Sequence, residues 1–460
     1  MPSKQFSSLK LSSALIDNLD SMGYHSMTPV QAESLPHILQ EKDLIVQAKT
    51  GSGKTAAFGL GILDGINPRF FGVQALVLCP TRELADQVAK ELRTLARSIP
   101  NIKLVVLCGG KPLRAQADSL EHGAHIVVGT PGRIKDHLSR ETLDLHQLEM
   151  LVLDEADRML DMGFQDEIQH IVRNTRRNRQ TLLFSATYPK AIKKMCNDIL
   201  LNPLTIKVDA QHETNVIKQH FYETTEKQRP DSLLGIFEHY YPESAVVFCR
   251  TKIQCDEVAY WLQDHDIDAL ALHGDLEQRE RDQVLVRFAN KSCPVLVATD
   301  VAARGLDIKS LEVVINYELP HDPEVYVHRI GRTGRAGAIG LAMSLYTNEE
   351  VSRIIAIEDY EEFSSQSEST DTLKRDSNYR LQASMSTLQI DAGKKNKMRP
   401  SDLLGALTKD AGLAGKQIGK IDIFDVFTYV AIERNAIRKA LNYFKNGKVK
   451  GRNVRAREIR

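Results

Sequence analysis

Residues 48–55 read AKTGSGKT. They follow the apolar run Leu44-Ile45-Val46 and precede a predicted helix over residues 56–63. Between a strand and a helix, glycines let the backbone curl around phosphates, toward which the helix N-terminus adds partial positive charge. In such loops the lysine reaches the β- and γ-phosphates and the final Ser or Thr binds Mg²⁺. The pattern predicts a phosphate site formed by Ala48, Lys49, Thr50, Gly51, Ser52, Gly53, Lys54 and Thr55. The alternative is a flexible glycine-rich loop, because the general pattern has glycine where this chain has Ala48.

A second predicted strand, residues 150–153, ends in carboxylates at Asp154, Glu155 and Asp157. A carboxylate at the C-terminal end of a parallel strand lies beside the phosphate crevice of such folds. Asp154 suits Mg²⁺ coordination through water, and Glu155 suits positioning and deprotonating the attacking water. An acidic quartet alone is usually a solvated turn. Its place after an apolar strand, together with Lys54 and Thr55, favours a metal and catalytic role.

Short apolar runs alternate with amphipathic stretches through most of the chain. The runs are continuous rather than alternating in polarity, as in strands buried on both faces of a parallel sheet. The first series comprises residues 44–46, 75–78, 104–107, 126–128, 151–153 and 181–184, and the second 245–248, 269–272, 295–298, 313–315 and 341–343. Helical segments such as 83–95 separate them. The pattern predicts an α/β fold of two doubly wound parallel-sheet lobes.

The C-terminal region has a different pattern and a different charge. Its predicted elements are strand 387–390, helix 400–407, strands 418–423 and 428–432, helix 436–444 and strand 454–459. This βαββαβ order is typical of an RRM-like domain. Residues 391–460 hold 17 Lys and Arg against 7 Asp and Glu, whereas the whole chain is neutral. A basic module attached to an acidic body favours polyanion binding, and a solvated basic face is the alternative.

The length of 460 residues fits about three domains. We predict a first lobe at 1–209, a second lobe at 216–360, a linker at 361–386 and the RRM-like domain at 387–460. No apolar run approaches the roughly 18 residues of a membrane helix, and the chain does not start like a signal peptide. The six cysteines lack CxxC spacing, so we expect buried, reduced thiols. We expect a cytoplasmic monomer that binds no membrane.

Further short motifs follow in a fixed order. The first lobe contains Phe6, residues 23–24 (GY), 28–31 (TPVQ), 80–84 (PTREL), 109–110 (GG), 130–133 (TPGR), 154–157 (DEAD) and 185–187 (SAT). The second contains 247–249 (VFC), 273–274 (HG) with Gln278 and Arg281, 298–307 (ATDVAARGLD) and 328–335 (HRIGRTGR). With this order and spacing, the chain from Phe6 to Arg335 resembles the DEAD-box RNA helicases. These are ATP-driven enzymes with two RecA-like lobes, and Ala48 is their usual residue at its position.

The resemblance implies roles in nucleotide binding and hydrolysis. Gln31 would hydrogen-bond adenine with Tyr24 nearby, although an ordinary core aromatic is the alternative for Tyr24. The catalytic set would be Glu155, Asp154, Lys54, Arg332 and Arg335, with Gly305 and Asp307 lining the same cleft. Both arginines belong to the second lobe, so hydrolysis would depend on closure. The residues that couple hydrolysis to lobe movement would be Asp157, Ser185, Thr187 and His328. Simple buried hydrogen bonding is their alternative.

The resemblance also implies an RNA path across both lobes. Its residues would be Arg82, Gly110, Thr130 and Arg133 on the first lobe and Gln278, Arg281 and Thr299 on the second. Arginines, threonines and backbone N–H groups suit phosphate and 2′-hydroxyl contacts rather than base reading. We therefore expect the motor to have little sequence specificity.

The basic region contains residues 393–400 (GKKNKMRP), 403–407 (LLGAL) and 418–421 (IGKI). It is similar to the C-terminal domain of the family's bacterial ribosomal-RNA helicases, which implies a hairpin of large-subunit ribosomal RNA and pre-ribosomal particles as partners. Strand 387–390 has no aromatic residue and strand 428–432 has only Tyr429, so base stacking of the usual RRM kind is not expected. The candidate contacts are Lys394, Lys395, Lys397, Lys448, Lys450 and Arg452.

Two other classes of function compete with this interpretation. An ATP-dependent RNA clamp with an inactive motor usually lacks the metal-binding or water-activating carboxylates, which are intact here. A DNA helicase shares the lobes, but the residues at 28–31 and the RRM-like region favour RNA. A cheap discriminator is which nucleic acid stimulates ATP hydrolysis.

Overall fold

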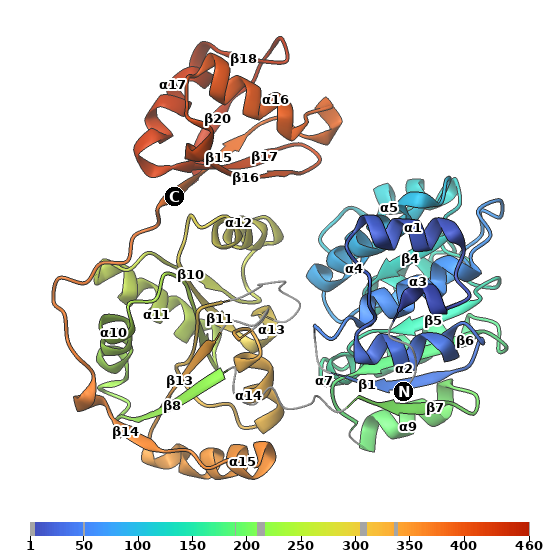
Figure 1. The fold of residues 1–460 in the computed structure, drawn as a ribbon, viewed down its shortest axis with the longest axis horizontal. Helices are drawn as coiled ribbons and strands as arrows, with labels where there is room; N and C mark the ends of the chain where they lie inside the picture. Colours follow the sequence, from blue (N-terminus) through green and yellow to red (C-terminus); the bar gives the residue numbers. More distant parts are fainter. Residues whose placement is uncertain are drawn as a thin grey trace. The chain divides into compact units, whose positions relative to one another are not determined.

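The computed structural model describes residues 5–48, 51–188, 190–208, 217–303, 311–334 and 339–459. The chain divides mainly into two compact units, residues 1–213 and residues 214–304 with 308–460. The first unit is lobe 1. The second contains lobe 2 and a small C-terminal domain, residues 385–459, that we call the tail domain (Figure 1). The predicted boundary between the lobes, residues 209–216, lies outside the described residues.

Lobe 1 is built on a parallel sheet with strand order β3-β4-β2-β5-β6-β1-β7. Its strands are β1 (Leu44–Gln47), β2 (Ala75–Leu78), β3 (Leu104–Leu107), β4 (Ile126–Gly129), β5 (Met150–Leu153), β6 (Gln180–Ser185) and β7 (Leu204–Lys207). Its helices are α1 (Ser13–Ser21), α2 (Pro29–Ile38), α3 (Lys54–Gly65), α4 (Arg82–Leu95), α5 (Leu113–Glu121), α6 (Pro131–Ser139), α7 (Ala156–Asp161), α8 (Gln165–Arg173) and α9 (Lys190–Ile199). All six predicted strands are confirmed.

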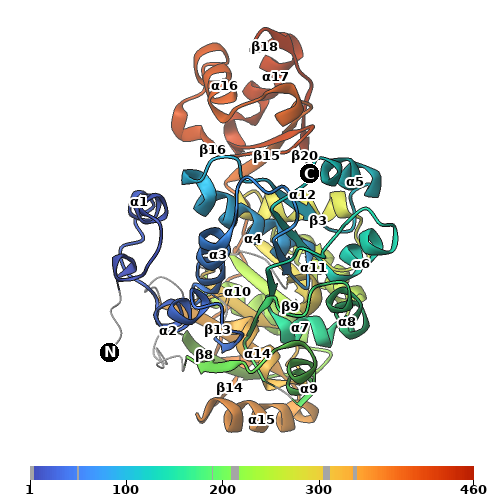
Figure 2. The same ribbon diagram turned by 90° about the vertical axis from the view of Figure 1, so that its right-hand side faces the viewer.

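Alternate residues of the lobe 1 strands point into two separate cores. Val77 packs with α1 to α4 on one face, whereas Leu76 packs with α5 to α9 on the other. Figure 2 shows these two groups of helices on opposite sides of the sheet. Strands buried on both faces have continuous apolar runs for this reason. The same arrangement places the C-terminal ends of the parallel strands along one edge, where the loops carry the motifs.

Lobe 2 repeats this plan with the parallel order β10-β11-β9-β12-β13-β8-β14. Its strands are β8 (Ile217–Glu223), β9 (Ala245–Cys249), β10 (Ala269–Leu272), β11 (Val295–Thr299), β12 (Val313–Asn316), β13 (Gly340–Tyr346) and β14 (Ser367–Ser369). Its helices are α10 (Arg229–Tyr240), α11 (Lys252–Asp264), α12 (Gln278–Ala289), α13 (Asp300–Ala303), α14 (Pro323–Ile330) and α15 (Val351–Glu361). The five predicted strands are confirmed. The six cysteines of the chain are free and buried, as expected from their spacing.

The connection at 361–386 runs along the surface of lobe 2. It supplies the edge strand β14, and the side chains of Leu373 and Tyr379 are buried in the lobe 2 core. Arg375 pairs with Asp231 at 2.9 Å, and its Nε also donates to Glu238. The segment between lobe 2 and the tail domain is therefore packed over much of its length.

The tail domain has an antiparallel sheet of order β16-β17-β15-β20, covered on one face by two helices. Its elements are β15 (Met385–Ile390), α16 (Pro400–Gly405), β16 (Ile418–Ile423), β17 (Thr428–Glu433), α17 (Ile437–Asn446) and β20 (Ala456–Ile459). The predicted βαββαβ order is confirmed. A hairpin of β18 (Lys448–Val449) and β19 (Arg452–Asn453) is additional. It lies on the helical side of the sheet (Figure 1).

Candidate nucleotide and RNA sites

The phosphate loop connects β1 to α3. Gly53 precedes the helix with a φ of 91°, and a Cβ there would lie 2.5 Å from Nε2 of Gln31. A side chain at this position would therefore clash as well as strain the backbone. Lys54 is buried, and its Nζ donates to the carbonyl of Ala48 at 2.9 Å. The predicted phosphate-binding residues Lys49 and Thr50 lie outside the described residues.

The segment that precedes α2 packs directly against this loop. Thr28 caps α2, and its hydroxyl also donates to the carbonyl of Ser52 at 2.8 Å. Gln31 closes the capping box and donates from Nε2 to the carbonyl of Gly53 at 3.0 Å. Tyr24 is 39% exposed, so it is not a core aromatic. Two polar side chains of the predicted adenine-reading motif thus hold the phosphate loop itself.

The carboxylates after β5 lie in a buried setting. Burial raises the pKa of Asp154 to about 7, although the Lys54 ammonium lowers it in part. Among the described residues, Oδ1 of Asp154 has no hydrogen-bond partner. Glu155, the residue just before α7, has a φ of 53°, an unusual conformation for a residue with a side chain. Backbone strain of this kind often occurs at functional sites.

Asp157 joins the DEAD motif to the SAT motif after β6. Its Oδ2 accepts hydrogen bonds from the backbone N–H groups of Ala186 and Thr187, each at 3.0 Å. Burial opposes its charge, but Lys54, Arg158 and the Thr187 N–H together lower the pKa of Asp157. Ser185 donates from its hydroxyl to the carbonyl of Thr187 at 2.7 Å. Three of the four predicted coupling residues are thus brought together in lobe 1. The fourth, His328, lies on α14 of lobe 2.

The four lobe 1 residues predicted to contact RNA follow the C-terminal ends of three neighbouring strands. Arg82 begins α4, Gly110 follows β3 with a φ of 78°, and Thr130 and Arg133 follow β4. A Cβ on Gly109 would lie 2.8 Å from Arg82 Nη2, so the guanidinium rests on the Gly109-Gly110 loop. The structure thus brings the four residues to one edge of the sheet.

Lobe 2 places Gln278 and Arg281 on α12 and Thr299 at the end of β11. Arg332 follows α14 and is buried. The predicted site residues Gly305, Asp307 and Arg335 lie outside the described residues.

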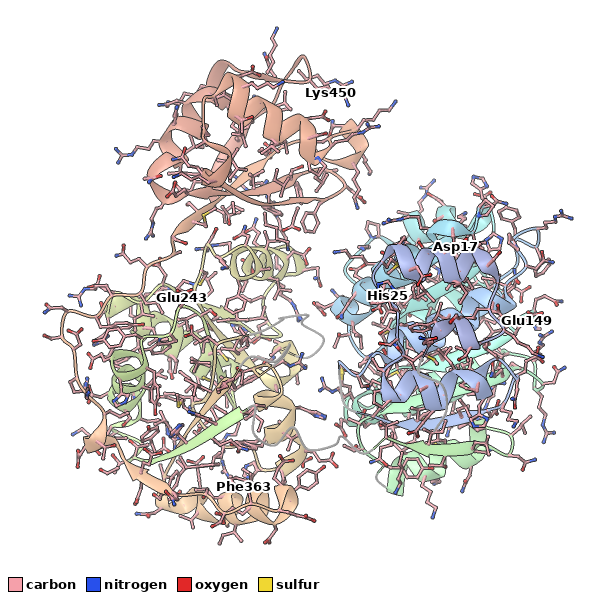
Figure 3. The ribbon with its side chains drawn as sticks, viewed as in Figure 1. Asp17, His25, Glu149, Glu243, Phe363 and Lys450 are labelled. Atoms are coloured by element: carbon pink, nitrogen blue, oxygen red, sulfur yellow. The ribbon has the colours of Figure 1, made fainter. Side chains whose placement is uncertain are left out.

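The candidate contacts of the tail domain form two basic clusters that lie side by side, one of Lys394, Lys395 and Lys397 and the other of Lys448, Lys450 and Arg452. Lys394 and Lys395 form a short turn, which ends at Lys397. From the β18–β19 hairpin, Lys450 reaches this turn, where its Nζ donates to the carbonyl of Lys397 at 3.2 Å and pairs with Asp402 at 3.4 Å. Figure 3 shows Lys450 at the periphery of the domain, on the helical side.

The opposite face of the tail sheet packs against α12. Asn290, just after this helix, donates from Nδ2 to the Thr387 hydroxyl at 2.9 Å. The Arg279 guanidinium lies 5.8 Å from the centre of the Phe427 ring. Thr387, Gln389 and Tyr429 are buried. The face on which an RRM ordinarily stacks bases is therefore covered.

Comparison with known proteins shows the family to which this chain belongs. The model of the DEAD/DEAH box helicase family matches residues 28–195, and the helicase conserved C-terminal domain matches 227–337. The chain is similar to ATP-dependent RNA helicase DbpA of Escherichia coli strain K12, with 54% identity over 99% of both chains. The chain belongs to the DEAD-box RNA helicases. It is an ATP-dependent RNA helicase, and so an ATP hydrolase.

Other relatives share the motor without the whole chain. The DEAD-box helicase CshA of Bacillus cereus is 47% identical over 77% of this chain and 67% of its own. A solved structure of Saccharomyces cerevisiae Dbp5 L327V bound to RNA and ADP BeF3 matches with a TM-score of 0.73 and 30% identity, over 81% of this chain and 97% of that one. The DbpA RNA binding domain model matches residues 387–458, so the tail domain of this helicase is an RNA-binding domain.

Arg329 connects two motifs of the helicase; sequence reasoning quoted it in a motif but gave it no role. Its guanidinium is buried and bonds both carboxylate oxygens of Asp300, at 2.6 and 2.8 Å, and Oδ1 of Asn316 at 3.0 Å. It therefore joins the motif at 298–307 to the one at 328–335. The sequence signal for this role was an arginine within a motif near the end of a helix. The role itself could not be predicted, because the partners of Arg329 lie in separate segments of the chain.

In the part of the chain that the structure describes, no helix is long and apolar enough to cross a membrane.

Proposed function

We propose that this helicase remodels large-subunit ribosomal RNA, within pre-ribosomal particles, and that its tail domain directs it to a structured hairpin. The observation that carries the proposal is the contact between Lys450 and the Lys397 carbonyl, which unites the two basic clusters. Clustered lysines and arginines bind phosphates, and spaced rows of them fit the two phosphate rows of an RNA helix. The candidate contacts are Lys394, Lys395, Lys397, Lys448, Lys450 and Arg452.

The covered sheet face supports a structured rather than a single-stranded target. Thr387 and Tyr429 are buried beneath α12, so bases have no access to them. The available basic surface lies on the helical side, where Lys450 projects (Figure 3). Recognition there would depend on the shape and phosphates of a folded RNA. Target choice then falls to the tail domain, because the motor's candidate contacts suit the RNA backbone alone.

In the motor, the phosphate loop fits ATP with Mg²⁺. Oδ1 of buried Asp154, which has no partner among the described residues, and the hydroxyl of Thr55 are oxygen ligands of the kind that Mg²⁺ prefers. Asp154 and Thr55 would hold the ion, which neutralises phosphate charge when bound. Lys54 would leave the Ala48 carbonyl for the phosphates, and Gln31 would read adenine. Glu155, fixed by its position at the start of α7, would take a proton from the attacking water.

Arg332 and Arg335 would stabilise the charge that develops on the transferred phosphate, from the second lobe. Asp157, Ser185, Thr187 and His328 would transmit closure between the nucleotide and the RNA. Arg82, Gly110, Thr130, Arg133, Gln278, Arg281 and Thr299 would bind the RNA backbone. We also propose that the protein works as a monomer in the cytoplasm. Light scattering of the purified chain tests the oligomeric state.

A titration tests the targeting proposal. RNA-stimulated ATP hydrolysis of the full chain and of residues 1–386 is measured with fragments of large-subunit ribosomal RNA and with scrambled RNA of equal length. We expect the full chain to prefer one hairpin-containing fragment and the shortened chain to respond weakly and equally to all. Thermal unfolding of the shortened chain controls for damage to lobe 2. Equal preference in the two chains would contradict targeting by the tail domain.

A further inference from the structure

Gln116, buried on α5, connects two segments of lobe 1 that are distant in the sequence. Its Nε2 donates to the carbonyl of Cys108 at 2.8 Å, just before the Gly109-Gly110 loop. Its Oε1 accepts from Nη1 of Arg133 on α6 at 2.9 Å and contacts Nε2 of His137 at 3.1 Å. One amide therefore joins three elements.

The hydrogen-bond roles in this network follow from its partners. The Cys108 carbonyl can only accept and the Arg133 guanidinium can only donate, so the amide of Gln116 has one possible orientation. Nε2 of His137 must then donate to Oε1. Its Nδ1, 2.7 Å from the hydroxyl of Thr142, accepts. Burial and the charge of Arg133 both lower the pKa of His137, which agrees with this neutral form.

Arg133 holds the same loop on its other side. Its Nη1 also donates to the carbonyl of Lys111 at 3.0 Å, and its Nε lies 3.5 Å from Asp136. Gly109 and Gly110 are therefore held at the residue before them by Gln116 and at the residue after them by Arg133. Glycine backbone is intrinsically the most mobile, so these two contacts set the position of the loop relative to α6.

We propose that Gln116 and His137 are positioning residues that fix the spacing between the Gly109-Gly110 loop and the N-terminus of α6 for gripping the RNA backbone. The loop glycines and Gly132, the second residue of α6, carry backbone N–H groups, which bind phosphates well when held in place beforehand. The inference rests on the proposed RNA contacts of lobe 1. It differs from them in assigning a function to two buried residues that touch no RNA.

The test compares Gln116→Leu with the intact chain, using ATP hydrolysis titrated with unstructured RNA and, separately, with ATP. We expect the RNA concentration for half-maximal stimulation to rise about tenfold, the effect of losing a hydrogen bond to a charged group. The maximal rate and the ATP dependence should change little, because saturating RNA can reassemble the loop. Gln116→Glu keeps the acceptor for Arg133 and His137 but loses the donor to Cys108, so an intermediate effect is expected. His137→Phe should raise the RNA concentration for half-maximal stimulation less than Gln116→Leu does.

Gln74→Leu is the matched control. Gln74 is also buried in lobe 1, and its amide also makes three hydrogen bonds, to Asn67 N, Asn67 O and Phe70 O, just before β2 begins. We expect it to lower the unfolding temperature as Gln116→Leu does without changing the RNA response. An equal RNA response in the two leucine variants would overturn the proposal. Arg82→Ala separates the possibilities: if it weakens RNA binding and Gln116→Leu does not, only the positioning role fails, and if neither does, the proposed RNA contacts of lobe 1 fail.

Discussion

The hydroxyl of Thr187 donates to the carboxylate of Asp157 across 3.1 Å, joining motifs that are 30 residues apart. With the two backbone N–H groups, it gives Oδ2 of Asp157 three donors. These three bonds link the segment after β5 to the segment after β6. Movement of one motif must therefore disturb the other.

Replacement of Thr187 by valine removes one of these donors and leaves the two backbone bonds. We expect RNA-stimulated ATP hydrolysis to persist within a few-fold, while duplex unwinding per ATP falls at least tenfold. Both are measured on the same short duplex. Thr181→Val, at a buried position of β6, the strand that precedes Thr187, is the control. A parallel loss of hydrolysis and unwinding would assign Thr187 to the chemical step instead.

Glu155→Gln should abolish turnover while ATP and RNA binding remain. The amide cannot accept the water proton, but Asp154 and Lys54 are untouched. We expect a long-lived complex on RNA, visible as slow dissociation of labelled RNA in the presence of ATP. Asp161→Asn, at the end of α7, controls for loss of a nearby carboxylate. Hydrolysis by the Glu155→Gln variant at near wild-type rates would show that another group is the base.

The sequence predicted the strands with long apolar runs and missed those without them. β7 has one buried residue, β8 reads IKQHFYE, and β14 reads SES. Their pairing depends on neighbouring strands, which a local pattern does not contain. The glycine, lysine and carboxylate motifs were visible because their chemistry is local. Gln116 and Arg329 were not, because each acts through partners from separate segments.

Arg332→Ala should reduce the maximal RNA-stimulated rate by about 10³-fold or more, as expected for an arginine that neutralises a phosphoryl-transfer transition state. ATP binding in the absence of RNA, measured with a fluorescent analogue, should change little. Arg380→Ala is the control, because Arg380 is an exposed arginine of the lobe 2 surface that pairs with Asp266. If Arg332→Ala changes the rate little but weakens ATP binding strongly, Arg332 contacts bound ATP in the ground state rather than stabilising the transition state.

Glu350→Ala should destabilise lobe 2 strongly. Arg229 is fully buried, and its Nη2 pairs with Glu350 at 2.7 Å. Removing the carboxylate leaves the buried guanidinium paired with Glu226, an exposed carboxylate 2.9 Å away, so we expect a cost of up to about 3 kcal/mol. Asp231→Ala, which breaks the more exposed pair with Arg375, should cost about 1 kcal/mol or less. Chemical denaturation measures both. The double change Arg229→Met with Glu350→Leu should recover most of the stability. If the double variant stays as unstable as Glu350→Ala, the lost stability comes from packing rather than from the buried charge.

The two clusters of the tail domain should contribute together to the salt dependence of RNA binding. Each lysine that contacts a phosphate releases counterions, so its loss flattens the plot of log affinity against log salt by about one unit. Lys395→Ala should flatten the slope for the ribosomal hairpin and leave that for scrambled RNA unchanged. Lys450→Ala should do more, because its ammonium also holds the Lys397 carbonyl and so keeps the two clusters together. Lys416→Ala, in the same domain but outside both clusters, should change neither slope. The affinities are measured by fluorescence anisotropy at several salt concentrations. If all three variants shift both RNAs alike, the clusters supply only general charge, and hairpin selection must come from elsewhere in the tail domain.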